Sequence, residues 1–264
     1  MMKKIIRTLI LAVGLLIMYV PIFMLAVYSF TDSTTIGSIR GFSIDNYRTL
    51  FGTPELKEMI VGTFVLAIGS AIIATLLGTL GAIGAFYSKN KTKTFVNATN
   101  RIPIINADVV TGFSLCILLI IAFGIEKESY VPLVIGHVTL SAPFVFTSVL
   151  PKLKQMDNAL YEAALDLGCT PGQALIKVVI PQIIPGIISG FTLAITLSLD
   201  DYFITTYTKP ATFDTISTYV VNATKGSQTQ IKTALWALST VILAVVIIAV
   251  IIMNVTSGKD KEEA

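Results

Sequence analysis

Long apolar runs separated by short polar segments form the dominant pattern of this sequence. Each run is close to or above the roughly 20 residues that an α-helix needs to cross a bilayer. The six runs are 9–30, 59–87, 103–123, 131–150, 184–207 and 231–254. Because apolar runs of this length are typical of membrane-spanning helices, the pattern predicts an all-α, polytopic membrane protein with six transmembrane helices. We expect residues 1–264 to form a single transmembrane domain.

Basic residues between the runs predict how the chain is oriented. Segments on the amino-terminal side of the membrane hold 12 Lys and Arg residues, and segments on the opposite side hold 7. The densest group lies in the short segment 88–101, which we interpret as a loop. Since cytoplasmic loops carry the excess of Lys and Arg, both termini and the polar segment 151–185 are expected to be cytoplasmic. On the opposite side we expect a short helix at 45–51 and a loop at 209–230.

Small residues recur at every fourth position of the second run, namely Ser70, Ala74, Gly78 and Ala82. The fifth run opens with a similar pair, Gly186 and Gly190. Small side chains let helices approach closely in a membrane, so these rows predict a tightly packed bundle. The pattern leaves open whether the rows pack within this chain or against a second subunit.

The polar segment between the fourth and fifth runs has the signals of a helical hairpin. Asp157 is a favourable N-cap residue, and Gly168 stands where a glycine in the left-handed conformation would end the first helix. Thr170 and Gln173 have the spacing of a capping box at the start of a second helix. Pro181 is then expected to end that second helix before the next apolar run.

A specific motif overlaps this hairpin. It consists of Glu162, Ala163, Ala164, Gly168 and Pro181. Their spacing, with apolar positions before the proline, resembles the EAA loop of ABC-transporter permeases. In that family the loop projects from the cytoplasmic face and docks into a cleft of an ATP-binding subunit. The resemblance therefore implies that these residues couple the membrane domain to an ATPase, whereas the helix signals alone indicate only an ordered hairpin between spans.

The composition narrows the possible functions. The chain is 54% hydrophobic and 13% charged, and its formal net charge of +3 does not suggest nucleic acid as a partner. Cys116 and Cys169 lack the spacing of a redox or metal motif, and no phosphate-binding or nucleophile pattern occurs. We therefore predict that the chain is not an enzyme and binds no metal or cofactor, so another chain must bind any ATP. His137 is interpreted as a hydrogen-bonded packing residue, with a ligand or proton-relay role as the alternative.

Three acids lie within or near the apolar runs, namely Asp108, Asp200 and Asp201. An acid at the bilayer centre costs roughly 2.5–3.5 kcal/mol, so such residues are expected to face a cavity or a partner. We interpret them as lining an aqueous route for cations, to which Tyr202 could offer its ring face. Of the adjacent pair, Asp201 is favoured because it shares a helical face with other polar residues. The alternative is that the acids are hydrated or capped helix ends.

A second resemblance involves the segments that contain these acids. Residues 196–202 (TLSLDDY), 108–112 (DVVTG) and 19–23 (YVPIF) look like segments of the spermidine/putrescine permeases, the PotC type. The resemblance covers nearly the whole chain and implies a type I, MetI-like ABC importer permease in a prokaryotic cytoplasmic membrane. It further implies a second permease subunit, two ABC ATPase subunits that use ATP, and an extracytoplasmic binding protein. The alternatives are an importer permease for an amino acid, iron chelate or anion, and an ATP-independent transporter.

Overall fold

The computed structural model describes residues 2–32, 41–225 and 234–244, and most of these residues are helical. The elements are α1 (Met2–Ser29), α2 (Asp45–Gly52), α3 (Pro54–Tyr87), α4 (Asn90–Ile105), α5 (Asp108–Ile117), the π turn η1 (Leu118–Ala122), α6 (Val131–Gln155), α7 (Asn158–Asp166), α8 (Pro171–Ala174), the π turn η2 (Leu175–Val179), α9 (Ile180–Asp200), α10 (Phe203–Thr208) and α11 (Ile216–Lys225). A further helix covers Ala234–Ala244. No strand forms within the described ranges, where one isolated bridge pairs Thr31 with Phe42. The all-α prediction is confirmed.

The helices also confirm the polytopic character of the chain. Four described segments are long and apolar enough to cross a membrane, namely Arg7–Ser29, Pro54–Tyr87, Val131–Gln155 and Pro171–Asp200. The pair Asn90–Ile105 and Asp108–Ala122 also qualifies if it is taken as one span bent by 105°. The predicted sixth span, 231–254, lies largely outside the described residues, and its described part, Ala234–Ala244, is an apolar helix. The structure thus supports four or five of the six predicted spans.

The third apolar run differs from its prediction. Instead of one straight span at 103–123, the chain bends between α4 and α5, where Asn106 and Ala107 have extended backbone. The basic segment 88–101, expected to be a loop, forms most of α4. Lysines are compatible with a helix whose polar face is exposed, so a cluster of charge alone does not indicate a loop. The expected loop at 209–230 likewise contains a helix, α11.

Pro181 does not end the second helix of the hairpin, contrary to the prediction. The helix continues from Pro171 to Asp200 through α8, η2 and α9. A proline removes one backbone donor and crowds the preceding turn, but a wider π turn can accommodate the mismatch. Here η2 ends two residues before Pro181, and Pro185 also lies inside α9. The hairpin is therefore continuous with the next span.

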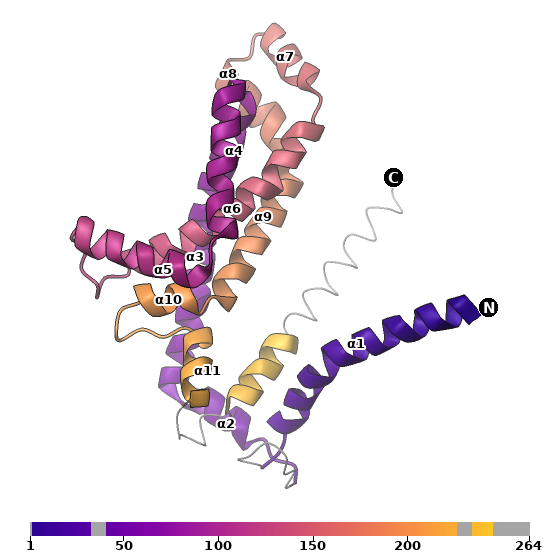
Figure 1. The fold of residues 1–264 in the computed structure, drawn as a ribbon, viewed down its shortest axis with the longest axis vertical. Helices are drawn as coiled ribbons and strands as arrows, with labels where there is room; N and C mark the ends of the chain where they lie inside the picture. Colours follow the sequence, from indigo (N-terminus) through magenta and orange to yellow (C-terminus); the bar gives the residue numbers. More distant parts are fainter. Residues whose placement is uncertain (1, 33–40, 226–233, 245–264) are drawn as a thin grey trace. The chain divides into compact units, whose positions relative to one another are not determined.

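The contacts along the chain form two compact units, Met1–Glu58 with Val220–Ala264, and Met59–Tyr219. The second unit contains all the candidate functional residues. Within it, α6 and α9 run side by side, with α7 and α8 at one end and α10 at the other (Figure 1). In the same unit α4 packs against α6, and α5 packs against α10.

The row of small residues on α3 is buried within this chain, with Ser70 against α9 and Gly78 against α6. Its members, Ser70, Ala74, Gly78 and Ala82, are all buried. A Cβ atom at Gly78 would lie 2.7 Å from Cβ of Val145 and 2.8 Å from the carbonyl oxygen of Ala142. The row therefore needs no second subunit to cover it, which resolves the alternative that the sequence left open.

Gly186 and Gly190 bring α9 close to α6 in the same way. A Cβ atom at Gly190 would lie 3.0 Å from Cα of Val145, and one at Gly186 would lie 2.8 Å from Cγ of Lys152. Val145 and Ile183 are fully buried in the hydrophobic core around these contacts. The close approach of α6 and α9 thus forms the frame that holds the hairpin at one end and α10 at the other.

The packing at Gly78 predicts a clear difference between two alanine substitutions on α3. Gly78→Ala should lower the thermal unfolding midpoint of the detergent-solubilised protein, because overpacking a core typically costs about 1–3 kcal/mol. Gly84→Ala is the matched control, since a Cβ atom there would meet no atom within 4 Å. A midpoint that falls equally in both variants would contradict the packing described.

Candidate functional site

The predicted fifth span contains a break in its helix. α9 stops at Asp200, and α10 begins at Phe203. Between them, Asp201 has an extended backbone (φ −66°, ψ 125°), and Tyr202 has φ −108° and ψ −42°. We call Asp201 and Tyr202 the elbow. Two of the four predicted route residues therefore form the junction between two helices.

The Asp201 side chain caps the first turn of α10. Its Oδ1 atom accepts a hydrogen bond from the backbone N–H of Ile204 (3.2 Å), and Oδ2 accepts one from the N–H of Thr205 (2.7 Å). The Thr205 hydroxyl also donates to Oδ2, at 2.7 Å. A carboxylate is favourable at this place because a helix N-terminus offers free N–H groups and a partial positive charge. These hydrogen bonds allow the carboxylate to be buried, and Asp201 is only 7% exposed.

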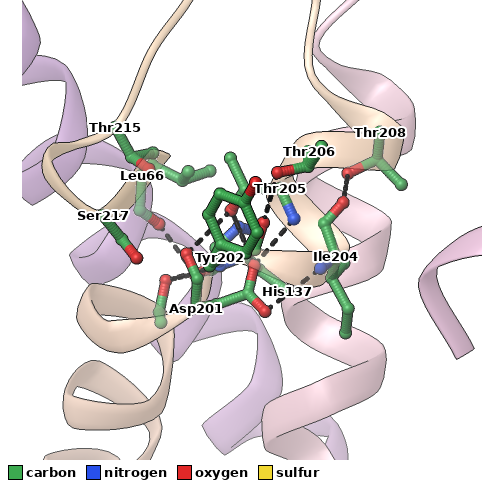
Figure 2. Close-up of polar contacts among 12 residues, drawn as sticks. Leu66, His137, Asp201, Tyr202, Ile204, Thr205, Thr206, Thr208, Thr215 and Ser217 are labelled. Atoms are coloured by element: carbon green, nitrogen blue, oxygen red, sulfur yellow. Dashed lines mark hydrogen bonds and ion pairs between the residues drawn. The ribbon is translucent and has the colours of Figure 1, made fainter. Parts of the chain in front are cut away.

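His137 connects the elbow to α6. Its ring is fully buried, with Nδ1 2.7 Å from Oγ of Ser198 and Nε2 3.0 Å from Oγ1 of Thr205. Nε2 also lies 3.8 Å from Oδ2 of Asp201, and the Ser198 hydroxyl is 3.3 Å from that of Ser70 on α3. We call these five residues the polar cluster, and Figure 2 shows His137, Thr205 and Asp201 converging in it. The expectation that His137 is a hydrogen-bonded packing residue is confirmed.

The structure places the two adjacent acids in different surroundings. Asp200 is exposed, and its backbone carbonyl accepts a hydrogen bond from the Ser217 hydroxyl at 3.2 Å. Asp201, which the sequence favoured as the acid on the solvated face, is instead buried in the polar cluster. The helix breaks at this point, so the predicted continuous polar face does not form. The Thr205 hydroxyl donates to the Asp201 carboxylate, and the Ser198 hydroxyl contacts His137. An aspartate just before a short helix is a capping signal, and it was present in the sequence.

The other two predicted route residues also lie around α10. Asp108 is the exposed first residue of α5. α5 packs closely on α10, since a Cβ atom at Gly112 would lie 2.9 Å from Cα of Ile204. Tyr202 is half-buried, and its ring packs edge-on against that of Phe203, with 5.2 Å between the ring centres. Contact of these residues with a substrate stays a prediction.

The hairpin before α9 has the capping geometry that the sequence predicted. Asp157 accepts a hydrogen bond from a backbone N–H of α7, at 2.9 Å. Gly168 has φ +87°, in the left-handed region, and its N–H donates to the carbonyl of Leu165 at 2.9 Å. The next N–H, of Cys169, donates to the carbonyl of Ala164 at 3.0 Å, which completes a Schellman motif. Gly168 therefore ends α7 as predicted.

The second helix of the hairpin begins with a complete capping box. The hydroxyl oxygen of Thr170 accepts from the N–H of Gln173 at 3.4 Å, and Oε1 of Gln173 accepts from the N–H of Thr170 at 3.0 Å. Two free backbone donors at the helix start are thus satisfied locally. This boundary also confirms the sequence prediction.

The hairpin exposes part of its motif and several apolar side chains. Glu162 and Ala163 are exposed, whereas Ala164 is buried. Leu167 and Ile176 are 86% and 66% exposed. Leu167 lies between the two helices of the hairpin, whereas Ile176 lies in Pro171–Asp200, a segment long and apolar enough to cross a membrane. Glu162, Ala163 and Leu167 are therefore accessible at the hairpin.

The fold and the site together define a class of protein. Long apolar helices make the chain a multi-pass membrane protein, and a capped hairpin with exposed apolar side chains joins two of them. In the part of the chain that the structure describes, no group of three or more His, Cys, Asp and Glu side chains could hold a metal ion. Long apolar helices joined by a capped hairpin are typical of a transport permease. The chain belongs to the family of binding-protein-dependent transport system inner membrane components, whose model matches residues 78–257.

Curated relatives are similar to most of this chain. The spermidine/putrescine transport system permease protein PotC of Escherichia coli (strain K12) is 28% identical over 235 residues, which cover 89% of this chain and 87% of the relative. The putrescine transport system permease protein PotI of the same organism is 30% identical over 210 residues, or 76% and 73% of the two chains. PotC of Haemophilus influenzae is 26% identical over 243 residues, or 92% and 93%.

Solved structures confirm the predicted permease fold. A bacterial ABC transporter involved in the import of the acidic polysaccharide alginate matches with a TM-score of 0.71 at 20% identity, over 95% of this chain and 96% of the other. An amino acid ABC transporter with histidines matches with a TM-score of 0.54 at 16% identity, over 81% of this chain and 98% of the other. The fold is thus that of a type I, MetI-like ABC permease. At these identities the likeness concerns the fold alone.

Proposed function

We propose that this chain is a permease subunit of an ATP-driven ABC importer that carries spermidine, putrescine or both across the cytoplasmic membrane. The observation that carries the proposal is its similarity to three polyamine permeases over 73–93% of their lengths. The charges in the spans support a cationic substrate. The runs 103–123 and 184–207 contain Asp108, Asp200 and Asp201 but no Lys or Arg. A route lined by acids attracts di- and triammonium ions.

The substrate route that we propose contains Asp108, Asp200, Asp201 and Tyr202. Asp200 is exposed, so its carboxylate is available to an ammonium group. The neighbouring ring of Tyr202 could add a cation–π contact. Asp201 contributes negative charge near the route. It also fixes the shape of the elbow, because its carboxylate oxygens accept hydrogen bonds from α10. Asp108 begins the helix that packs against α10.

The hairpin supplies the coupling to ATP in this proposal. The contact with an ATPase subunit is made by the motif residues Glu162, Ala163, Ala164, Gly168 and Pro181. The exposed side chains of Leu167 and Ile176 add an apolar component to this contact. ATP is bound by the ATPase subunits, and this chain binds no cofactor. Because the hairpin is continuous with α9, a movement at the ATPase contact would reach the membrane helices directly.

The complete importer that we propose has a second permease subunit, two ABC ATPase subunits and an extracytoplasmic binding protein. Dependence on a binding protein is part of the family description. A solved alginate ABC transporter of the same fold is in complex with a periplasmic protein that holds an alginate pentasaccharide, which supports such an arrangement. In this proposal residues 1–264 form one permease domain in a prokaryotic membrane, with both termini and the hairpin in the cytoplasm.

Uptake competition tests the proposed substrate against other solutes, since the same fold serves alginate and amino acid transporters. In cells that carry the complete transporter, unlabelled putrescine should compete with labelled spermidine, and basic amino acids should not. Competition by amino acids instead of putrescine would overturn the proposed substrate and leave the permease assignment in place. Uptake that continues after ATP depletion would indicate an ATP-independent transporter.

The left-handed backbone at Gly168 predicts a specific loss of coupling. Gly168→Val should distort the hairpin, because a side chain in this conformation costs roughly 1–2 kcal/mol and a β-branched one is especially disfavoured. Uptake and substrate-stimulated ATPase activity should both fall strongly, with normal insertion of the permease. Gly172→Val is the matched control, since this glycine has no positive φ and a Cβ atom there would meet nothing within 4 Å. Normal uptake by Gly168→Val would contradict the coupling role.

The exposed acid predicts a loss of transport on neutralisation. Asp200→Asn should lower the efficiency of spermidine uptake roughly tenfold, which corresponds to about 1.4 kcal/mol for one charge-assisted contact. Asp201→Asn keeps an acceptor for α10 but removes the charge, and the double variant should transport less than either single one. Asparagine has nearly the volume of aspartate, so this change separates charge from packing. Unchanged uptake in a normally assembled double variant would show that the acids are hydrated or capped helix ends.

A further inference from the structure

His137 is the buried titratable residue that the proposed route does not use, yet it touches both helices of the break. It lies on α6, outside α9 and α10. Nδ1 of its ring contacts Ser198 in the last turn of α9, and Nε2 contacts Thr205 in the first turns of α10. One side chain therefore spans the elbow from a third helix.

The direction of the hydrogen bonds follows from the groups available. An ionised carboxylate can only accept, so the Thr205 hydroxyl gives its single hydrogen to Oδ2 of Asp201 at 2.7 Å. The oxygen of that hydroxyl must then accept from Nε2–H of His137, at 3.0 Å. The result is a directed chain from the imidazole through Thr205 to the carboxylate that caps α10. Breaking the first bond leaves a buried donor unsatisfied and weakens the second.

The geometry of the elbow decides where the adjacent route residues point. Asp200 is the last residue of α9, and Tyr202 comes directly before α10. Only the elbow joins the two helices along the chain, so the angle between them depends on contacts with other elements. α6 supplies a contact beside His137, because a Cβ atom at Gly136 would lie 2.6 Å from Cγ2 of Ile204. The imidazole therefore contacts α10 next to the place where α10 packs against α6.

We propose that His137 is a positioning residue of the substrate route: its Nε2–H holds the Thr205–Asp201 cap and thereby fixes the directions of Asp200 and Tyr202. The expected effect of His137 on transport rests on the proposed function. The effect of His137 on the geometry of the elbow does not depend on which substrate is carried. His137 itself touches no substrate in this proposal.

Three substitutions at one position separate this proposal from simple packing. His137→Leu removes both ring nitrogens, His137→Gln places an amide N–H near the position of Nε2, and His137→Asn reaches only the position of Nδ1. His137→Leu loses the bonds to Ser198 and to Thr205, of which the proposal assigns the effect on the route to the second. In cells with the complete transporter, loss of that bond should raise the KM for spermidine uptake about fivefold. His137→Gln should restore the KM to within about twofold of the original, because it retains that one bond. His137→Asn should not restore it, and equal rescue by Asn would overturn the proposal.

Thr205 and Thr208 provide a matched pair on the same helix. Both are fully buried, but the Thr208 hydroxyl donates to the carbonyl of Ile204, within α10. Thr205→Val removes the bond to His137 together with the bond to Oδ2 of Asp201, so it should raise the KM at least as much as His137→Leu does. Adding His137→Leu to Thr205→Val should then have little further effect. Thr208→Val should leave the KM unchanged. Fully additive effects of His137→Leu and Thr205→Val would overturn the proposed chain of hydrogen bonds.

Cysteine labelling tests the elbow without reference to the substrate. In a background that lacks Cys116 and Cys169, the rate at which an impermeant thiol reagent modifies Asp200→Cys should change several-fold when His137→Leu is added, and His137→Gln should reverse the change. Labelling of Lys127→Cys, in an exposed turn, is the control and should stay constant. An unchanged rate at position 200 would overturn the inference. A changed rate at position 200 would support the inference, and if the transporter with Asp200 intact takes up no polyamine, that result would count against the proposed substrate instead.

Discussion

A break between two helices frees backbone N–H groups, and those of α10 lie on the fully buried residues Ile204 and Thr205, so they need partners within the protein. This constraint shapes the polar cluster. At the elbow a carboxylate meets the requirement, because Asp201 accepts the N–H groups of Ile204 and Thr205. Burying a carboxylate creates a second requirement, since a buried charge is costly without donors. The Thr205 hydroxyl supplies one donor, and His137 in turn hydrogen-bonds that hydroxyl. Each polar group in the cluster thus supplies a hydrogen-bond partner for the group before it.

Close helix packing makes these hydrogen bonds possible and links them to the hairpin. The glycines Gly186 and Gly190 bring α9 close to α6, and Gly136 does the same for α10. The residues from Pro171 to Asp200 form one helical segment, despite its prolines. One end of this segment begins at the capping box of the hairpin, and the other ends at the elbow. A displacement of the hairpin therefore has a continuous helical path to Asp200.

The sequence predicted the caps of the hairpin correctly, but it predicted the helix end at Pro181 and the breaks in the helices wrongly, for a physical reason. The caps at Gly168 and Thr170 depend on residues a few positions away, so local signals suffice. Apolar runs report only that a segment is long enough to cross a membrane, and they carry no information on bends such as the one between α4 and α5. The elbow depends on His137, which is 61 residues from Ser198 and 68 from Thr205 along the chain. The buried state of Asp201 could be predicted only with that long-range contact in hand.

The two adjacent acids explain why a shared fold leaves the substrate open. A transporter for an acidic polysaccharide has the same fold with a TM-score of 0.71, so the bundle itself does not select the charge of the solute. In the proposed importer, selection is left to the binding protein and to side chains of the proposed route. Consecutive positions at a helix end point in different directions, and here one carboxylate turns inward while the other stays exposed. The carboxylate of Asp201 accepts hydrogen bonds from N–H groups of α10, whereas Asp200 is exposed. In the proposed route, Asp201 therefore shapes the elbow, and Asp200 offers its exposed carboxylate to the cation.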